Sequence, residues 1–202
     1  MSEPDYVYEF ADIVEKWNAI EERIKDAELI CGEAVVPAIN ELRYAGRQFV
    51  DAMSIYVRGN LTQIDLDRIN THIKNVRYNL TNADHDCTDA VCLFFHEKLK
   101  GMLDNYDIVL INNYFPNAEE FLQRMDGANR IISGSRKDRH NRISDYKALA
   151  EMHIPRLKDF HSEMLTSEPL ILAHQQSRKM RLYWLPLVVA VIAGVLTVVF
   201  YR

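Results

Sequence analysis

Glycine and proline are scarce in this chain, with seven and six copies among 202 residues. Runs of Val, Ile or Thr, which favour strands, are also few before residue 182. Glycine and proline are the residues that helix interiors tolerate least, so their scarcity removes the usual obstacles to long helices. The composition therefore predicts an all-α protein.

Cysteine is sparse too, with three copies, an odd number that does not suit a disulfide framework. Cys92 and His96 stand one helical turn apart and could face one ion. However, Cys87 precedes Cys92 by five residues, whereas common zinc sites place two cysteines two to four residues apart. We expect no metal and no cofactor.

Motifs of catalysis are missing as well. The chain has no Gly-rich phosphate loop, no nucleophile elbow and no convincing catalytic triad. The acidic start, MSEPDYVYEF, has no apolar run behind a basic residue, so we expect no signal peptide. Before Arg178 the chain carries 20 Lys and Arg against 29 Asp and Glu, a net charge of −9. This acidity argues against nucleic-acid binding by the whole surface, although RNA is kept as an alternative partner of a local basic patch.

One apolar stretch, LYWLPLVVAVIAGVLTVVFY, covers residues 182–201 without a charge. About twenty residues at ~1.5 Å each match a hydrocarbon core ~30 Å thick. Basic residues precede it (Arg178, Lys179, Arg181), and aromatic residues stand at its two ends (Tyr183, Trp184, Tyr201). This layout is typical of a transmembrane helix in contact with a lipid bilayer.

The position of this stretch predicts a tail anchor, because only Arg202 follows it. Three basic residues before the span and one after it favour a cytosolic N-terminal domain, with the C-terminus on the far side of the membrane. We expect a helical bundle at 1–166, a juxtamembrane helix at 167–181 and the single-pass transmembrane helix at 182–201.

Apolar residues recur at alternating spacings of three and four before the span, as at Phe10, Ile13, Trp17 and Ile20. Such heptad patterns predict helices that pack lengthwise along one another. We expect a bundle of about six helices, interrupted at Thr81-Asn82, at 112–117, at 133–142 and at 167–169. Pro155 should kink the sixth helix. The expected helices cover 4–31, 38–57, 62–80, 84–110, 118–132 and 143–166.

Two groups of residues are candidates for contact with phosphate or lipid head groups. One is the basic segment around residue 136, for which a solvated loop is the alternative interpretation; the other is the set of basic residues before the span. The candidates are Arg130, Arg136, Lys137, Arg139, Arg142, Arg178, Lys179 and Arg181. Within the span, Ala190 and Gly194 form a small-xxx-small pair that favours helix packing in lipid, which predicts a homo-oligomer.

The segment Arg156-Leu-Lys-Asp-Phe-His161 resembles the short Arg-x4-His motif of the HEPN superfamily, with Leu157 at a position that is usually polar there. This superfamily consists of helical proteins and includes dimeric ribonucleases and membrane-linked defence effectors. The resemblance implies that Arg156 would stabilise the cleaved phosphate and that His161 would act as general acid or base. It also implies a role in defence or stress signalling.

These observations favour a non-enzymatic function: a tail-anchored membrane protein whose cytosolic domain is a scaffold or effector, acting by self-association and by binding an unidentified protein partner. The first alternative is a membrane-tethered HEPN-like ribonuclease that uses Arg156 and His161. The second is a tether of the SNARE kind, which requires one long exposed heptad helix beside the anchor. Here the heptads are spread over several segments separated by proline and glycine, which favours a closed bundle.

Overall fold

The protein is described by a computed structural model that covers residues 6–137 and 141–200, without the side chains of 195 and 197–200. Every regular element in these residues is helical, which confirms the predicted all-α class. The elements are α1 (Tyr6–Cys31), α2 (Val36–Tyr56), α3 (Gln63–Asn105), α4 (Ile108–Tyr114), α5 (Ala118–Lys137), α6 (Arg142–Ala148), the π-helix η1 (Leu149–His153) and α7 (Ile154–Phe200).

The chain divides into two compact units, each built from two stretches of sequence. The first unit comprises residues 1–96 and 125–155, and the second comprises 97–124 and 156–202. Both boundaries predicted from the sequence, after residues 166 and 181, fall inside α7.

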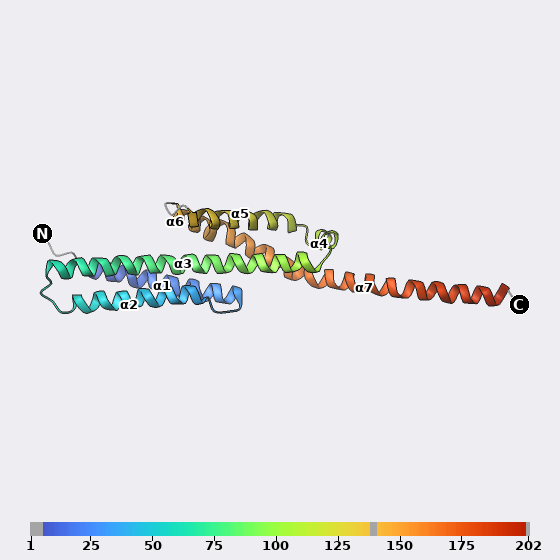
Figure 1. The fold of residues 1–202 in the computed structure, drawn as a ribbon, viewed down its shortest axis with the longest axis horizontal. Coiled ribbons are helices and arrows are strands. Elements are labelled where there is room, and N and C mark those ends of the chain that lie inside the picture. The colour runs from blue at the N-terminus through green and yellow to red at the C-terminus, as the bar shows by residue number, and fades with distance from the viewer. Residues whose placement is uncertain (1–5, 138–140, 201–202) are drawn as a thin grey trace. The chain divides into compact units, whose positions relative to one another are not determined.

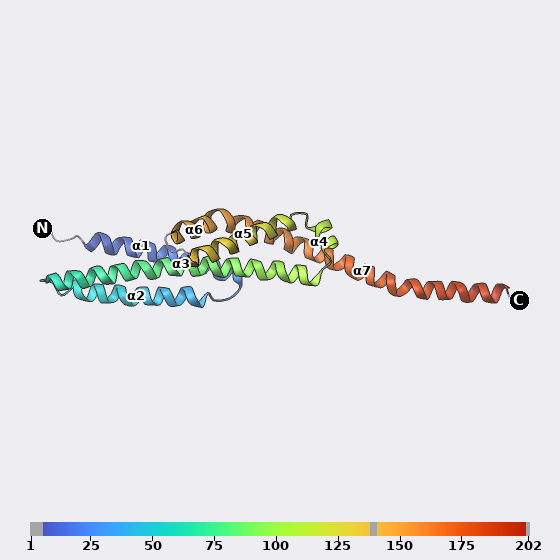
Figure 2. The same cartoon turned by 45° about the horizontal axis from the view of Figure 1, so that its top comes forward.

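In the first unit, α1 and α2 run alongside the part of α3 that belongs to this unit (Figures 1 and 2). The face of α1 that bears the predicted heptad pattern is the buried one, with Ile13 only 1 % exposed. Ala45 and Ala52 of α2 and Ile69 of α3 complete the same apolar core. The heptad pattern therefore identified the packing face correctly, because three- and four-residue spacings return to one side of a helix.

The start of α3 also follows the prediction. The hydroxyl of Thr62 accepts a hydrogen bond from the backbone N–H of Asp65 at 3.2 Å, and the Asp65 carboxylate accepts one from the N–H of Thr62 at 3.0 Å. This reciprocal pair is a capping box that satisfies two backbone donors at the helix end.

The predicted break at Thr81-Asn82 is wrong, because α3 runs through it without interruption. The Thr81 hydroxyl donates to the backbone carbonyl of Arg77 at 2.9 Å, which keeps this polar group inside the helix. Ala83 is fully buried. Threonine and asparagine cost a helix only ~0.7 kcal/mol each, so burial of the neighbouring residues outweighs their poor propensity.

The predicted break at Ser167-Glu168-Pro169 is also wrong, since α7 continues to Phe200. Ser167 is buried, and its hydroxyl lies 2.7 Å from the carbonyl of Tyr114 and 2.9 Å from that of Glu163. Ile171 is fully buried one turn further on. Packing on both sides of Pro169 offsets the ~3 kcal/mol that an internal proline costs a helix.

The connection predicted at 133–142 is shorter than expected, because α5 continues to Lys137. The irregularity predicted at Pro155 takes a different form: the π-helix η1 lies immediately before α7. A proline lacks the backbone N–H that would continue an α-helical ladder, and π-turns are one way in which helices absorb such an irregularity.

In the second unit, α4 and the beginnings of α5 and α7 form the core. The ring of Phe121 stacks on that of Phe160 with centroids 5.5 Å apart, and Phe115 meets Phe121 edge-on at 6.2 Å. After Ile171, α7 extends beyond the other helices of its unit (Figure 1). Among the described residues, no helix combines the length and the apolar content needed to cross a membrane.

Candidate functional site

The last part of α7 is apolar and exposed. Each of its side chains described between Leu182 and Leu196 is exposed, and the large apolar ones range from 48 % at Val188 to 80 % at Tyr183. Because consecutive helical residues are about 100° apart, exposure at every described position means that apolar side chains point outward on all sides. No single face of this segment is reserved for packing against the rest of the chain.

The predicted lipid-contact and packing residues of α7 are all on its exposed surface. Arg178, Lys179 and Arg181 are exposed directly before the apolar segment. Ala190 and Gly194 are exposed within it, and a Cβ added at Gly194 would meet nothing within 4 Å. The surface at these small residues is therefore open to a second helix.

The basic segment around residue 136 is partly occupied by contacts inside the first unit. Arg136 forms an ion pair with Asp89 at 2.9 Å, and the guanidinium of Arg142 lies 5.6 Å from the ring centroid of Tyr146. Arg130 and Lys137 are exposed, whereas Arg139 lies outside the described residues.

Arg156 and His161, the residues of the HEPN-like motif, do not share a face of α7. Five residues along a helix correspond to about 140° of rotation. The Arg156 guanidinium lies 4.2 Å from the ring centroid of Phe160 and 3.5 Å from the Glu120 carboxylate. Burial lowers the pKa of His161, and the nearby Lys98 lowers it further. Arg156 therefore already has an anionic partner in Glu120. The ribonuclease mechanism stays a prediction.

The cysteines nearest to candidate ligands are buried in the first unit. Burial raises the pKa of both Cys87 and Cys92 to about 12, so both thiols are protonated near neutral pH. In the part of the chain that the structure describes, no group of three His, Cys, Asp or Glu side chains is placed to hold a metal ion.

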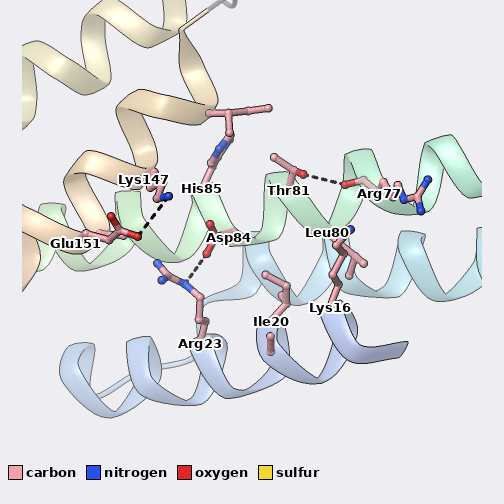
Figure 3. Close-up of a pocket in the computed structure, with 13 residues that line it drawn as sticks. Lys16, Ile20, Arg23, Arg77, Leu80, Thr81, Asp84, His85, Lys147 and Glu151 are labelled. Carbon is pink, nitrogen blue, oxygen red and sulfur yellow. Dashed lines mark hydrogen bonds and ion pairs between the residues drawn. The ribbon is translucent and has the colours of Figure 1, made fainter. Parts of the chain in front are cut away.

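The first unit contains a pocket of about 550 Å³ between α1, α3, α6 and η1 (Figure 3). Lys16, Leu80 and Arg77 lie at one end in that view and Lys147 and Glu151 at the other, with Ile20, His85 and the Arg23–Asp84 ion pair between them. The lining consists of Lys16, Ala19, Ile20, Arg23, Arg77, Leu80, Thr81, Asp84, His85, Ile143, Lys147, Ala150 and Glu151.

The charged groups of the pocket differ in how firmly they are held. Arg23 forms an ion pair with Asp84, and its Nη2 donates to the Thr88 hydroxyl at 3.2 Å. Burial raises the pKa of Asp84, although the charge of Arg23 opposes this shift. By contrast, the Lys147 Nζ lies 3.9 Å from the Glu151 carboxylate, too far for a hydrogen bond.

His85 is the most buried polar side chain of the pocket, at 3 % exposure. Its ring lies 4.0 Å from that of Tyr146, whose hydroxyl donates to Asp89 at 2.8 Å. Burial lowers the pKa of His85 to about 4; Arg142 acts in the same direction and Asp89 opposes it. The imidazole is therefore neutral at neutral pH. Its buried Nδ1 has no hydrogen-bond partner within the described part of the chain.

The pocket is not evident from the sequence, because its lining comes from residues more than a hundred positions apart. The features in the sequence that relate to the pocket are far apart: basic residues on three different helices and an irregular helical turn before Pro155. Comparisons of the chain with protein-family models, with curated proteins and with solved structures give no match.

Proposed function

We propose that this protein is a membrane-attached helical scaffold that acts by self-association and by binding a protein partner, without catalysing a reaction. The observation that carries the proposal is the exposure of apolar side chains on all sides of α7 between Leu182 and Leu196. A protein partner covers one face of a helix, whereas a bilayer surrounds it, so the bilayer is the better match.

Covering the exposed apolar side chains of this segment would contribute a large favourable free energy. Ten bulky apolar side chains in this segment are about half exposed. Full burial of such a side chain is worth ~1.5–3 kcal/mol, so covering what is still exposed would contribute on the order of 10 kcal/mol. The segment from 182 to 196 extends about 22 Å at 1.5 Å per residue. The sequence predicts that the span continues to residue 201, beyond the described side chains.

The basic residues before the segment support the same proposal. Arg178, Lys179 and Arg181 are exposed, and each basic residue beside an anionic membrane surface adds roughly 1 kcal/mol. Basic residues on this side of a span favour the cytosolic leaflet, so both helical units are expected to face the cytosol.

A non-catalytic role is supported by the state of the candidate catalytic pair. Arg156 is held between Glu120 and Phe160 and is not directed, together with His161, at one point on the helix surface. A phosphate would compete with the Glu120 carboxylate for this guanidinium.

The attachment is tested by fractionating cells that express the full-length protein. The wild type is expected in the membrane pellet after carbonate washing. The double variant Val188→Asp/Ile192→Asp should move to the soluble fraction, because each acidic residue in the middle of a span costs about 2.5–3.5 kcal/mol. The control is Val188→Leu/Ile192→Leu, which keeps the segment apolar. Wild-type protein in the soluble fraction, or equal partitioning of all three proteins, would contradict the attachment.

Self-association is tested by chemical crosslinking in native membranes. Gly194→Ile places a branched side chain on the open surface beside Ala190, so crosslinked oligomers should decrease. Ile192→Leu is the control, because residue 192 lies on the opposite side of the helix from residue 194. Equal crosslinking of wild type, variant and control would exclude a role of this surface in assembly.

A further inference from the structure

We propose that the pocket between α1, α3, α6 and η1 binds a small anionic amphiphile: an apolar body about 10 Å long with one carboxylate or phosphate group. The site lies entirely within the first unit, and this inference does not depend on membrane attachment by α7.

Between its two ends the pocket is lined by apolar side chains and by the Arg23–Asp84 ion pair. Ile20 of α1 and Leu80 of α3 line it, and Leu80 is 3 % exposed. Ala19 and Ala150 are small, so they leave space between their larger neighbours. From Lys16 to Arg23 the helix rises about 10 Å, which sets the length of the apolar body. The volume of about 550 Å³ suits a small molecule and is too small for a folded peptide helix.

Lys147 supplies the most loosely held cation of the pocket. At the other end, the Asp12 carboxylate lies 2.8 Å from the Lys16 ammonium and 2.9 Å from the Arg77 guanidinium, so those two cations already have an anionic partner. Lys147 is 69 % exposed in its side chain and lies 3.9 Å from Glu151, so it can turn towards an anion without losing a hydrogen bond. Asp84 and Glu151 would repel a ligand with several charges. The ligand therefore carries one anionic group.

Two further features distinguish this pocket from an ordinary surface groove. The first is His85, whose buried Nδ1 has no partner in the described residues, since a buried nitrogen without a hydrogen bond costs about 1–3 kcal/mol. A ligand head group, or a water that the ligand orders, would supply the missing bond. The second is η1, which contributes Ala150 and Glu151; π-turns are rare and are frequent at functional sites.

The test uses full-length protein in phosphatidylcholine nanodiscs and a decanoic acid that carries a photoreactive diazirine. After irradiation, mass spectrometry identifies the labelled peptides. We expect labelling of peptides that contain Ile20, Leu80 and Ala150, and we expect an excess of unlabelled decanoate or decyl phosphate to abolish it. Competition by decanoate alone would identify a fatty acid, and competition by decyl phosphate alone would identify a monoacyl phosphate; either supports the proposal.

Three other competition results would overturn it. If decanol competes as well as decanoate, the pocket does not recognise the anionic group. If inorganic phosphate competes as well, the pocket does not recognise the apolar body. Labelling that no competitor reduces would show that the pocket has no specific occupant.

Variants provide a second test. Ala150→Leu fills the apolar part and Lys147→Glu reverses one charge; each should reduce pocket labelling by about ten-fold or more, a loss of at least ~1.4 kcal/mol in binding. Lys147 is exposed, so its variant is expected to fold even where Ala150→Leu does not, and circular dichroism checks both. Lys100→Glu, an exposed lysine outside the lining, is the control. Unchanged labelling in Lys147→Glu, or an equal loss in Lys100→Glu, would refute the assignment.

Discussion

Replacement of Gly46 by alanine should destabilise the first unit, although Gly→Ala inside a helix usually does the opposite. Gly46 lies in α2 where Trp17 of α1 crosses it. A Cβ at position 46 would lie 2.9 Å from the Cη2 atom of Trp17 and 3.4 Å from its Cζ3 atom. The first distance is shorter than carbon atoms tolerate, so the indole or one of the two helices must move.

The magnitude follows from two opposing contributions. Alanine gains about 1 kcal/mol over glycine in helix propensity. Overpacking a core contact costs about 1–3 kcal/mol. The indole cannot turn freely, because its Nε1 donates a hydrogen bond to Glu21 at 3.0 Å. We therefore expect a net loss of about 1 kcal/mol in the free energy of unfolding.

Urea unfolding of full-length protein in detergent, followed by circular dichroism, measures this change. Gly134→Ala is the matched control: it lies in α5 of the same unit, and an added Cβ there would meet nothing within 4 Å. The free energy of unfolding of this control should increase by up to about 1 kcal/mol. In the double variant Trp17→Leu/Gly46→Ala, the alanine should no longer lower the free energy of unfolding relative to Trp17→Leu alone. If Gly46→Ala stabilises the protein as much as Gly134→Ala does, the close crossing of α1 and α2 is refuted.

Two further predictions concern His85 and the HEPN-like pair. The unfolded chain protonates His85 below about pH 6.5, whereas the folded imidazole, with its pKa lowered to about 4, stays neutral. Acidification from pH 6.5 to 4 should therefore remove up to about 3 kcal/mol of stability from the wild type, and urea titrations of His85→Gln should lack this contribution. Incubation of single-stranded RNA with wild type and with His161→Ala should give the same amount of intact RNA, because Arg156 is engaged by Glu120. Cleavage by the wild type that disappears in a folded His161→Ala variant would establish the ribonuclease instead.

Much of this fold follows from local properties of the sequence. The heptad pattern of α1 predicted which side of the helix is buried, since periodicity is a property of neighbouring residues. The capping box at Thr62 and Asp65 is equally local, and so is the apolar character of residues 182–201. In each case the relevant interaction lies within one or two turns of the chain.

Where the helices end and what gathers between them depends on tertiary contacts. Thr81 and Pro169 are poor helix residues, and the sequence alone predicted breaks there. Burial of Ala83 and Ile171 beside them favours continuity, and a few kcal/mol of packing exceeds the local penalty. The pocket is a still clearer case, because Arg23, His85 and Lys147 are far apart in sequence and only the packing of α1, α3 and α6 brings them together. Local propensity determined where helices form, whereas long-range burial decided how far they extend and which side chains meet.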